Sequence, residues 1–344
     1  MKKNKIVLIL FLVLILLLGL FVTKQNKNKS SNTNEDKKLL VTLVLDKGGV
    51  NDESFNQLAW EGAKKAKEEY GVEVKYLESK QESDYTTNIE TAVDLNSDLI
   101  IGIGFNLSKA IEDAALSYPD QKFAIIDGSF KTVPKNVSNI SFSESEAGYL
   151  TGLVAGKTSK TNKFGFIGGM QVPAVLHFKE GFEKGIKESN PNADLVVQYA
   201  NSFVDASKGK AIAQQMYNNG IDIIMTAGGG VNNGVYETGL ENGKYAVAVD
   251  MAQNHISPNV ILTSALKNVD VGVKLTIKEL KDGNFKGGNT TEYNIKNDGV
   301  GYEKTKLIPD DIIKFVDSKK ESMKNNKKRK DDIEINDIIF LFFQ

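Results

Sequence analysis

The chain has 344 residues, of which 41% are hydrophobic and 25% charged, so it is long enough for two globular cores and is not disordered throughout. Lysine plus arginine number 43 against 44 for aspartate plus glutamate, and a net charge of −1 argues against nucleic acid as a partner. The absence of cysteine excludes disulfides, cysteine-ligated zinc, iron–sulfur clusters and a cysteine nucleophile. With His177 and His255 as the sole histidines, we predict no metal site and no cofactor.

Residues 1–23 are predicted to form a signal or anchor segment. Three lysines precede an uninterrupted apolar run over residues 6–22, which as a helix would be about 25 Å long, near the lower limit for spanning a bilayer. No A-x-A-like cleavage site follows the run, so we favour a retained anchor over a cleaved signal peptide, although the length of the run fits either. Residues 24–38 are polar and lack an apolar period, which predicts a flexible tether.

From residue 39 onward, short apolar runs alternate with longer amphipathic stretches, a pattern typical of βαβ units in an α/β protein with a parallel sheet. Strands are expected at residues 39–45, 72–77, 98–104, 122–127, 163–168, 194–200, 221–228 and 245–250. Their centres are about 32, 26 and 24 residues apart in the first four and about 31, 27 and 23 apart in the second four. This repeated rhythm predicts two similar, doubly wound lobes.

The stretches between these strands have helical periodicity. Residues 143–159 begin with serine and glutamate in capping positions and continue as a helix of small residues, expected to pack closely on a sheet and to carry the chain into the second lobe. Residues 151–158 end like a phosphate-binding loop, but the two glycines are one residue closer to each other than that motif requires, and no strand precedes them. The glycine run at 228–230 follows a strand but lacks the G-x-G-x-x-G spacing, so a dinucleotide site is not expected either.

Residues that directly follow the predicted strands are the candidates for a binding site, because ligands of open parallel sheets lie beyond the carboxyl ends of the strands. Those positions are rich in glycine, carboxylate and aromatic side chains in both halves. Each type also has an ordinary structural explanation, since glycines form turns and carboxylates cap helices. Phe55 occupies a helical position where a core residue is the default, whereas Phe203 lies in a polar loop, which favours contact with a ligand.

Five segments, in one order along the chain, resemble the basic membrane protein family of solute-binding proteins of ABC importers, whose best understood branch is the purine nucleoside receptor. They are residues 44–65, 102–111, 201–230, 245–254 and 261–270. The resemblance implies a type I periplasmic-binding-protein fold, with two Rossmann-like lobes and a ligand cleft between them.

Three crossovers are expected between the lobes, near Phe142, Thr263 and Gly288. The first lobe would then comprise residues 39–143 and 264–288, and the second lobe residues 144–263 and 289–318. Residues 319–344 form a tail that is atypical of the family.

The resemblance also implies individual roles in the cleft. Phe55 and Phe203 correspond to the two aromatic residues that sandwich the base. Asp46, Asp250 and Lys267 correspond to positions that hold the ribose hydroxyls. Carboxylates accept charge-assisted hydrogen bonds from vicinal hydroxyls, so these residue types suit a nucleoside.

Three further residues complete the expected ligand-binding set. Gly228 corresponds to a backbone contact, and Asn106 and Asp127 are candidates for reading the edge of the base. Two interpretations of Lys267 stay open: it neutralises the carboxylates of the cleft, or it is a surface lysine near a hinge.

We therefore expect a non-enzymatic, extracytoplasmic binding protein for a purine nucleoside, with ABC permease and ATPase subunits as partners and a membrane attachment through the N-terminal segment. The lipidation cysteine of the family is missing, so a lipoprotein-like tether is replaced by the anchor. Alternatives are a membrane-bound sensor or regulator of the same fold without a transporter, another small ligand such as a sugar or amino acid, and a nucleoside-processing enzyme. The enzyme is disfavoured because His177 is predicted on a helix, in a packing or surface role, and His255 in a polar turn.

Overall fold

The structure, a computed structural model, describes residues 38–341, with side chains as far as residue 325. Strands of the first sheet are β1 (Leu40–Leu45), β2 (Glu73–Glu78), β3 (Leu99–Ile103), β4 (Phe123–Ile126), β5 (Val137–Phe142) and β11 (Asn289–Tyr293). Strands of the second sheet are β6 (Lys163–Gly168), β7 (Asp194–Tyr199), β8 (Ile223–Ala227), β9 (Tyr245–Asp250), β10 (Ile261–Lys267) and β12 (Val300–Tyr302). The predicted segment 1–23 and residues 24–37 of the predicted tether lie outside the described residues.

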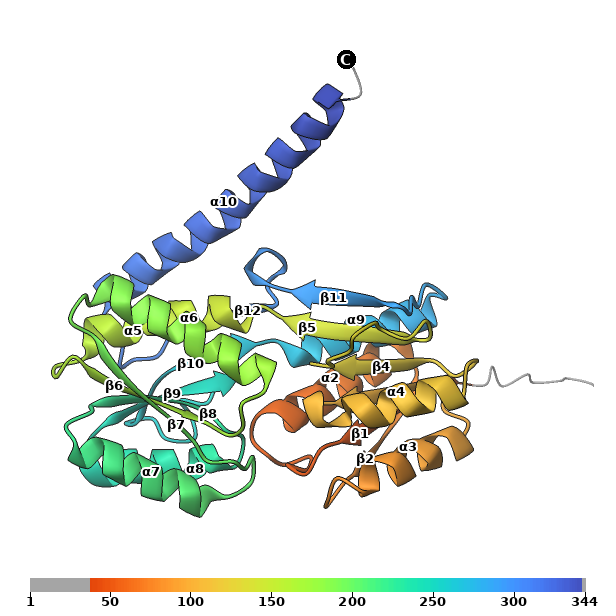
Figure 1. Ribbon diagram of the computed structural model, residues 1–344, viewed down its shortest axis with the longest axis horizontal. Coiled ribbons are helices and arrows are strands. Elements are labelled where there is room, and N and C mark those ends of the chain that lie inside the picture. The colour runs from red at the N-terminus through yellow and green to blue at the C-terminus, as the bar shows by residue number, and fades with distance from the viewer. Residues whose placement is uncertain (1–37, 342–344) are drawn as a thin grey trace, which may run out of the picture. The chain divides into compact units, whose positions relative to one another are not determined.

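Helices cover both faces of each sheet (Figure 1). Those of the first lobe are α2 (Phe55–Tyr70), α3 (Asp84–Asp94), η1 (Phe105–Leu107), α4 (Ser108–Ser117) and α9 (Val269–Lys281). Those of the second lobe are α5 (Glu144–Thr158), α6 (Pro173–Ser189), α7 (Ala206–Asn218), α8 (Val231–Asn242) and α10 (Asp310–Leu341), and η2 (Ile295–Asn297) lies between β11 and β12.

The two sheets have matching strand orders, β11-β5-β4-β3-β1-β2 and β12-β10-β9-β8-β6-β7. All strand pairs are parallel except β10 with β12. All eight predicted strands are present, and the α/β fold with two doubly wound lobes is confirmed. The apolar runs of the inner strands, such as β1 and β3, are buried on both faces of a parallel sheet, as their continuous pattern predicts, whereas the edge strands β2 and β7 are partly exposed.

The sequence did not predict β5, β10, β11 and β12, and the second and third crossovers lie later in the chain than expected. β10 continues to Lys267 within the second sheet, whereas residues 264–267 were predicted in the first lobe. β11 pairs with β5 in the first sheet, whereas residues from 289 onward were predicted in the second lobe. The reason for the later third crossover is that β11 is an edge strand that is polar and exposed except at Tyr293, so it carries no apolar pattern to reveal its sheet.

Helix α5 packs on β10 and β12 of the second sheet, as predicted, and it also packs closely on helix α6. A Cβ atom on Gly181 of α6 would lie 2.1 Å from the carbonyl oxygen of Ser145, and one on Gly152 of α5 would lie 2.5 Å from that of Phe182. Residues 151–158 are therefore part of a packing helix, as predicted, and not of a phosphate loop.

The variant Gly181→Ala is expected to lower the free energy of unfolding by about 1–3 kcal/mol, because the added methyl group forces the two helices apart. Urea denaturation measures this change. Gly301→Ala is the matched control, since its Cβ would meet only the flexible end of Lys320, at 3.6 Å. Equal midpoints for the Gly181→Ala variant and the parent chain would contradict this account of the helix pair.

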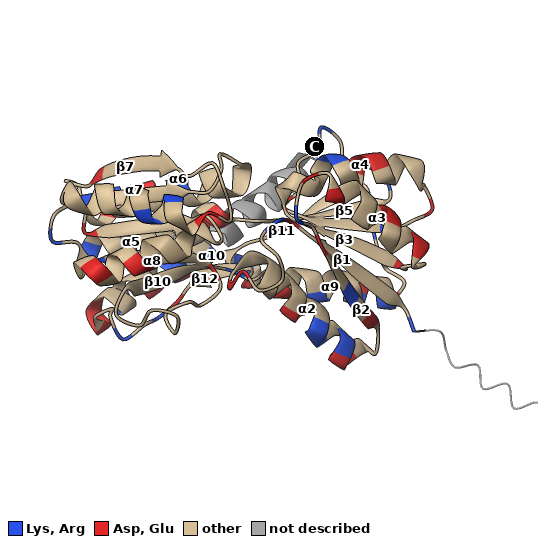
Figure 2. Ribbon diagram, turned by 90° about the horizontal axis from the view of Figure 1, so that it is seen from below, with Lys and Arg blue, Asp and Glu red and all other residues tan. Residues whose placement is uncertain are grey.

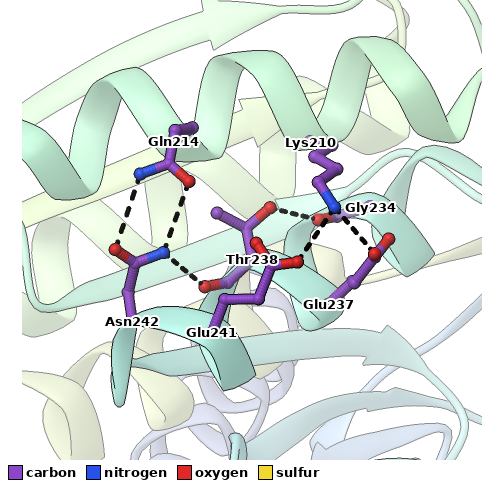
Figure 3. A network of polar contacts seen from close by, with 7 residues as sticks. All are labelled: Lys210, Gln214, Gly234, Glu237, Thr238, Glu241 and Asn242. Carbon is purple, nitrogen blue, oxygen red and sulfur yellow. Dashed lines mark hydrogen bonds and ion pairs between the residues drawn. The ribbon is translucent and has the colours of Figure 1, made fainter.

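The outer helices of the second lobe, α7 and α8, are joined by polar side chains (Figure 3). The ammonium of Lys210 lies between the carboxylates of Glu237 and Glu241, at 2.7 and 3.0 Å. Gln214 and Asn242 pair through their side-chain amides. Exposed pairs of this kind contribute little free energy, and they explain the charged face of the helix without any functional role.

Helix α10 runs without a break through residue 318, where the atypical tail was predicted to begin. Ile312 and Val316 in its first turns are buried against the second lobe.

Within residues 38–341, no helix combines the length and the apolar character needed to cross a bilayer. Basic and acidic residues are interspersed along the helices of both lobes (Figure 2).

Candidate functional site

A cavity of about 490 Å³ lies between the carboxyl ends of the strands of the two sheets. Its volume is in the range of small-molecule binding sites. Of the eight predicted site residues, the structure brings seven together on its wall: Asp46, Phe55, Asn106, Asp127, Phe203, Asp250 and Lys267.

Gly228, the eighth, does not line the cavity; its neighbours Ala227 and Gly229 do. The backbone N–H of Gly228 donates to Oδ1 of Asn232 at 2.9 Å, and its carbonyl accepts from the N–H of Val231 at 3.1 Å. Both backbone groups of Gly228 are therefore used within the loop that starts α8, although its carbonyl oxygen can accept a second hydrogen bond, so the expected contact of Gly228 with a ligand stays a prediction.

Lys267, the last residue of β10, forms the centre of a buried ionic cluster. Its side chain is 1% exposed, so it is not a surface lysine. Its Nζ atom lies 2.5 Å from Oδ2 of Asp127 and 2.7 Å from Oε1 of Glu144. Burial opposes the charged ammonium, but Asp127, Glu144 and Asp250 together raise the pKa of Lys267.

Asp127 and Asp250 occupy equivalent positions, at the ends of β4 and β9, the fourth strands of the two lobes. Both have the left-handed backbone conformation, with φ of 59° and 71°, which non-glycine residues seldom adopt outside turns and functional sites. Burial raises the pKa of each carboxyl group to about 6, although Lys267 opposes the rise. Oδ2 of Asp250 also accepts a 2.5 Å hydrogen bond from the hydroxyl of Ser54, which belongs to the first lobe.

The two predicted aromatic residues approach the cavity from different lobes. Phe55 lies in the first turn of α2, and the centroid of its ring is 5.2 Å from Nζ of Lys267. Phe203 lies in the loop after β7, where its carbonyl accepts a 2.8 Å hydrogen bond from the N–H of Gly230. A Cβ atom on Gly169 would stand 2.4 Å from the Phe203 ring, so glycine there makes room for the ring.

Glu144 and His177 were missed by the sequence analysis as site residues. Glu144 begins α5, and its side chain is 3% exposed. Burial favours its protonated form, yet Lys267 and the hydrogen bond from His177 lower the pKa of Glu144. His177 lines the cavity, with Nδ1 3.3 Å from Oε2 of Glu144, and this contact raises the pKa of the imidazole.

The sequence pattern does not reveal β5, so it indicates only a helix cap at residues 143–146. If β5 had been recognised, Glu144 would have stood two residues beyond the end of a strand, where ligand-binding residues are expected. Across the described part of the chain, no group of three or more acidic or histidine side chains could hold a metal ion.

A sequence model of the family described as "ABC transporter substrate-binding protein PnrA-like" matches residues 39–338. The CD4+ T-cell-stimulating antigen of Listeria monocytogenes is 40% identical over 309 residues, which cover 83% of this chain and 86% of the relative. The ABC transporter nucleoside-binding protein BmpA of Lactococcus lactis is 39% identical over 283 residues, or 76% and 80% of the two chains. Basic membrane protein A of Borreliella burgdorferi is 37% identical over 284 residues, or 81% and 83%.

Solved structures agree with these relatives. An ABC transporter solute-binding protein from Aeropyrum pernix superposes with a TM-score of 0.73 at 27% identity, covering 83% of this chain and 86% of that one. A transcriptional activator of the comK gene from Bacillus halodurans has a TM-score of 0.71 at 26% identity, covering 83% and 96%.

Proposed function

We propose a purine nucleoside as the ligand of this cavity, from the premise that the chain belongs to the family of PnrA-like substrate-binding proteins of ABC transporters. Members of this family work outside the cytoplasm and deliver a small molecule to permease and ATPase subunits. The observation that carries the nucleoside proposal is that Phe55 and Phe203, one from each lobe, line a cavity that also contains carboxylates. The Lactococcus lactis relative, 39% identical, is named a nucleoside-binding protein, which supports the same ligand.

The two rings suit a purine because a base has two π faces, and stacking on an aromatic ring contributes about 1–3 kcal/mol per base in nucleic-acid sites. Asn106, which lines the first-lobe side of the cavity, is the candidate for reading the edge of the base. Asp127 binds Lys267 through Oδ2, and among the described residues no donor binds its Oδ1, so Asp127 stays the second candidate for reading the edge of the base.

The carboxylates suit the ribose. Among the described residues, no donor binds Oδ2 of Asp46 or Oδ1 of Asp250, so each has an oxygen available to a hydroxyl. Lys267 uses two of its three protons on Asp127 and Glu144, which leaves one for an oxygen of the ligand. Binding through residues of both lobes couples the ligand to closure of the cleft, the state that a permease would recognise.

The variant Phe203→Ala is expected to weaken binding of inosine by about 5- to 150-fold, the loss of one stacking contact. Isothermal titration calorimetry measures the affinity. Phe315→Ala serves as control, because Phe315 lies on α10 and does not line the cavity. If Phe203→Ala binds inosine as tightly as the parent chain does, the base does not stack on Phe203, and the stacking argument for a nucleoside fails.

We further propose that residues 6–22 hold the protein at the extracytoplasmic face of the membrane as an uncleaved helix, since the chain has no cysteine for lipid attachment. N-terminal sequencing of the protein from membranes is expected to begin at residue 1 or 2. A mature N-terminus near residue 24 would contradict this proposal and indicate a cleaved signal peptide.

A sensor without a transporter is the second candidate, favoured by the similarity to the transcriptional activator of the comK gene from Bacillus halodurans. Both candidates use the same ligand cleft. Uptake of labelled inosine by cells with and without this protein separates them, because only a transport receptor changes the rate of uptake.

A further inference from the structure

We infer that Asn56 is a positioning residue: it holds the carboxylate of Asp46 so that the Oδ2 atom faces the cavity and receives a hydroxyl of the ligand. This inference rests on the proposed nucleoside function and assigns a role to a residue for which the family resemblance implied none. It concerns the contacts of a single amide group in the first turn of α2.

The amide of Asn56 has its two protons on two carboxylates. Nδ2 donates to Oδ1 of Asp46 at 2.7 Å and to Oδ2 of Asp52 at 3.0 Å. Ionised carboxylates only accept hydrogen bonds, so the nitrogen must face them and the orientation of the amide is chemically determined. The opposite atom, Oδ1 of Asn56, is buried without a partner among the described residues. Buried polar atoms normally have a hydrogen-bond partner. Within the described part of the chain, Oδ1 of Asn56 lacks one because the amide turns its donor nitrogen toward the two carboxylates.

Capping of α2 does not explain Asn56, because Asp52 already supplies that function. Oδ1 of Asp52 accepts from the backbone N–H groups of Ser54 and Gln57, both at 3.0 Å, and its Oδ2 accepts from the N–H of Asn56 at 2.8 Å. The side-chain amide of Asn56 therefore caps no backbone group of α2 itself, and its contact with the cap is the hydrogen bond that it donates to Asp52.

The carboxylate of Asp46 is fixed at one oxygen and open at the other. Oδ1 accepts from Asn56 and also from the backbone N–H of Gly48 at 2.9 Å. Oδ2 lies 3.6 Å from the point where a Cβ on Gly104 would stand, and a ring atom of Phe55 lies 3.5 Å from the same point. Because residue 104 has no side chain, Oδ2 and the Phe55 ring border the same space. A hydroxyl of a sugar whose base stacks on Phe55 would meet Oδ2 there.

The amide also favours the ionised form of Asp46. Burial raises the pKa of this carboxyl group, and the hydrogen bonds from Asn56 and Gly48 lower it. The titratable groups that face Asp46 are Asp52, which raises its pKa further, Lys47, which lowers it, and the phenol of Tyr85. Removing the amide leaves Asp46 harder to ionise, and a protonated carboxyl group is a weaker acceptor for a hydroxyl.

A double-mutant cycle on the full chain tests the inference, with inosine as the titrant in calorimetry. Asn56→Leu is expected to lower the affinity about tenfold or more at pH 7.5, and by a larger factor at pH 6. Asn56→Leu added to Asp46→Ala is expected to cause no further loss. Asn88→Leu, which removes a similar amide from α3 away from the cavity, is the control. Asn56→Ala replaces Asn56→Leu if the larger side chain prevents folding, as judged by thermal melting.

Three results would overturn the inference. They are an unchanged affinity of Asn56→Leu, a loss that adds in full to that of Asp46→Ala, and a loss that is the same at every pH, as a purely structural role would give. Failure of the unmodified chain to bind inosine or any other nucleoside would instead refute the proposed function, and the Asn56 inference with it.

Discussion

Replacing Lys267 by methionine is expected to abolish nucleoside binding and to lower the free energy of unfolding by about 3–5 kcal/mol at pH 7. The reason is that Lys267 is 1% exposed and holds Asp127 and Glu144 at 2.5 and 2.7 Å, so its removal leaves buried carboxylates without a cation. Methionine retains most of the volume, which keeps the packing on Phe55 and Phe142. Calorimetric titration with inosine and urea denaturation measure the two effects.

The destabilisation of Lys267→Met should diminish as the pH falls from 7 to 5. Carboxyl groups whose pKa is raised in the folded state stabilise the protein below their unfolded pKa and lose that contribution as the pH rises through the folded value. Lys274→Met, at an ion pair with Glu69 on the surface, is the matched control and should change neither quantity. A Lys267→Met variant as stable as the parent chain at pH 7 would contradict the assignment of an ionic cluster.

Asp250→Asn is expected to stabilise the unliganded protein at pH 7 while it weakens nucleoside binding. Burial raises the pKa of Asp250 to about 6 from an ordinary 3.8, so ionisation of the folded protein costs about 3 kcal/mol at pH 7. Asparagine keeps the size, tolerates the positive φ and still accepts from Ser54. Urea denaturation and titration with inosine measure the opposite changes.

The gain in stability from Asp250→Asn should be largest above pH 6 and absent below pH 4, where the aspartate is protonated in both the folded and the unfolded state. Asp205→Asn is the control. The side chain of Asp205 caps α7 by accepting a hydrogen bond from the backbone N–H of Lys208, and asparagine caps a helix equally well. If Asp250→Asn has a lower free energy of unfolding than the parent chain at pH 7, the ionised carboxylate of Asp250 does not destabilise the unliganded protein.

The sequence predicted the two lobes and seven of the residues that line the cavity because the informative signals were local. Eight strands are short apolar runs, and the rule that ligands lie beyond strand ends selects Asp46, Asp127 and Asp250 directly. In contrast, β5 mixes serine and asparagine with apolar residues, and β11 is polar except for Tyr293. Their assignment depends on pairing with each other across about 150 residues, which no local pattern encodes.

The contacts of individual side chains could not be read from the sequence for the same reason. Lys267 meets partners 140 and 123 residues earlier in the chain, so its sequence neighbours do not distinguish a buried cluster from a surface. In the run 228–230, three glycines are equivalent by composition, and only the position of Asn232 shows that the N–H of Gly228 is already used. Asn56 lies within a predicted amphipathic helix, where its bonds to two acids leave no periodic signal.

The central claim is that the cavity binds a nucleoside, and the most direct measurement is calorimetric titration of the ligand-free protein with adenosine and with AMP in parallel. A cavity whose charged side chains include Asp46, Asp127 and Asp250 beside Lys267 should accept the neutral nucleoside and repel the phosphate. We expect adenosine to bind at micromolar concentration or below and AMP to bind at least tenfold more weakly. Equal or tighter binding of AMP, or no binding of adenosine, inosine or guanosine, would contradict the account.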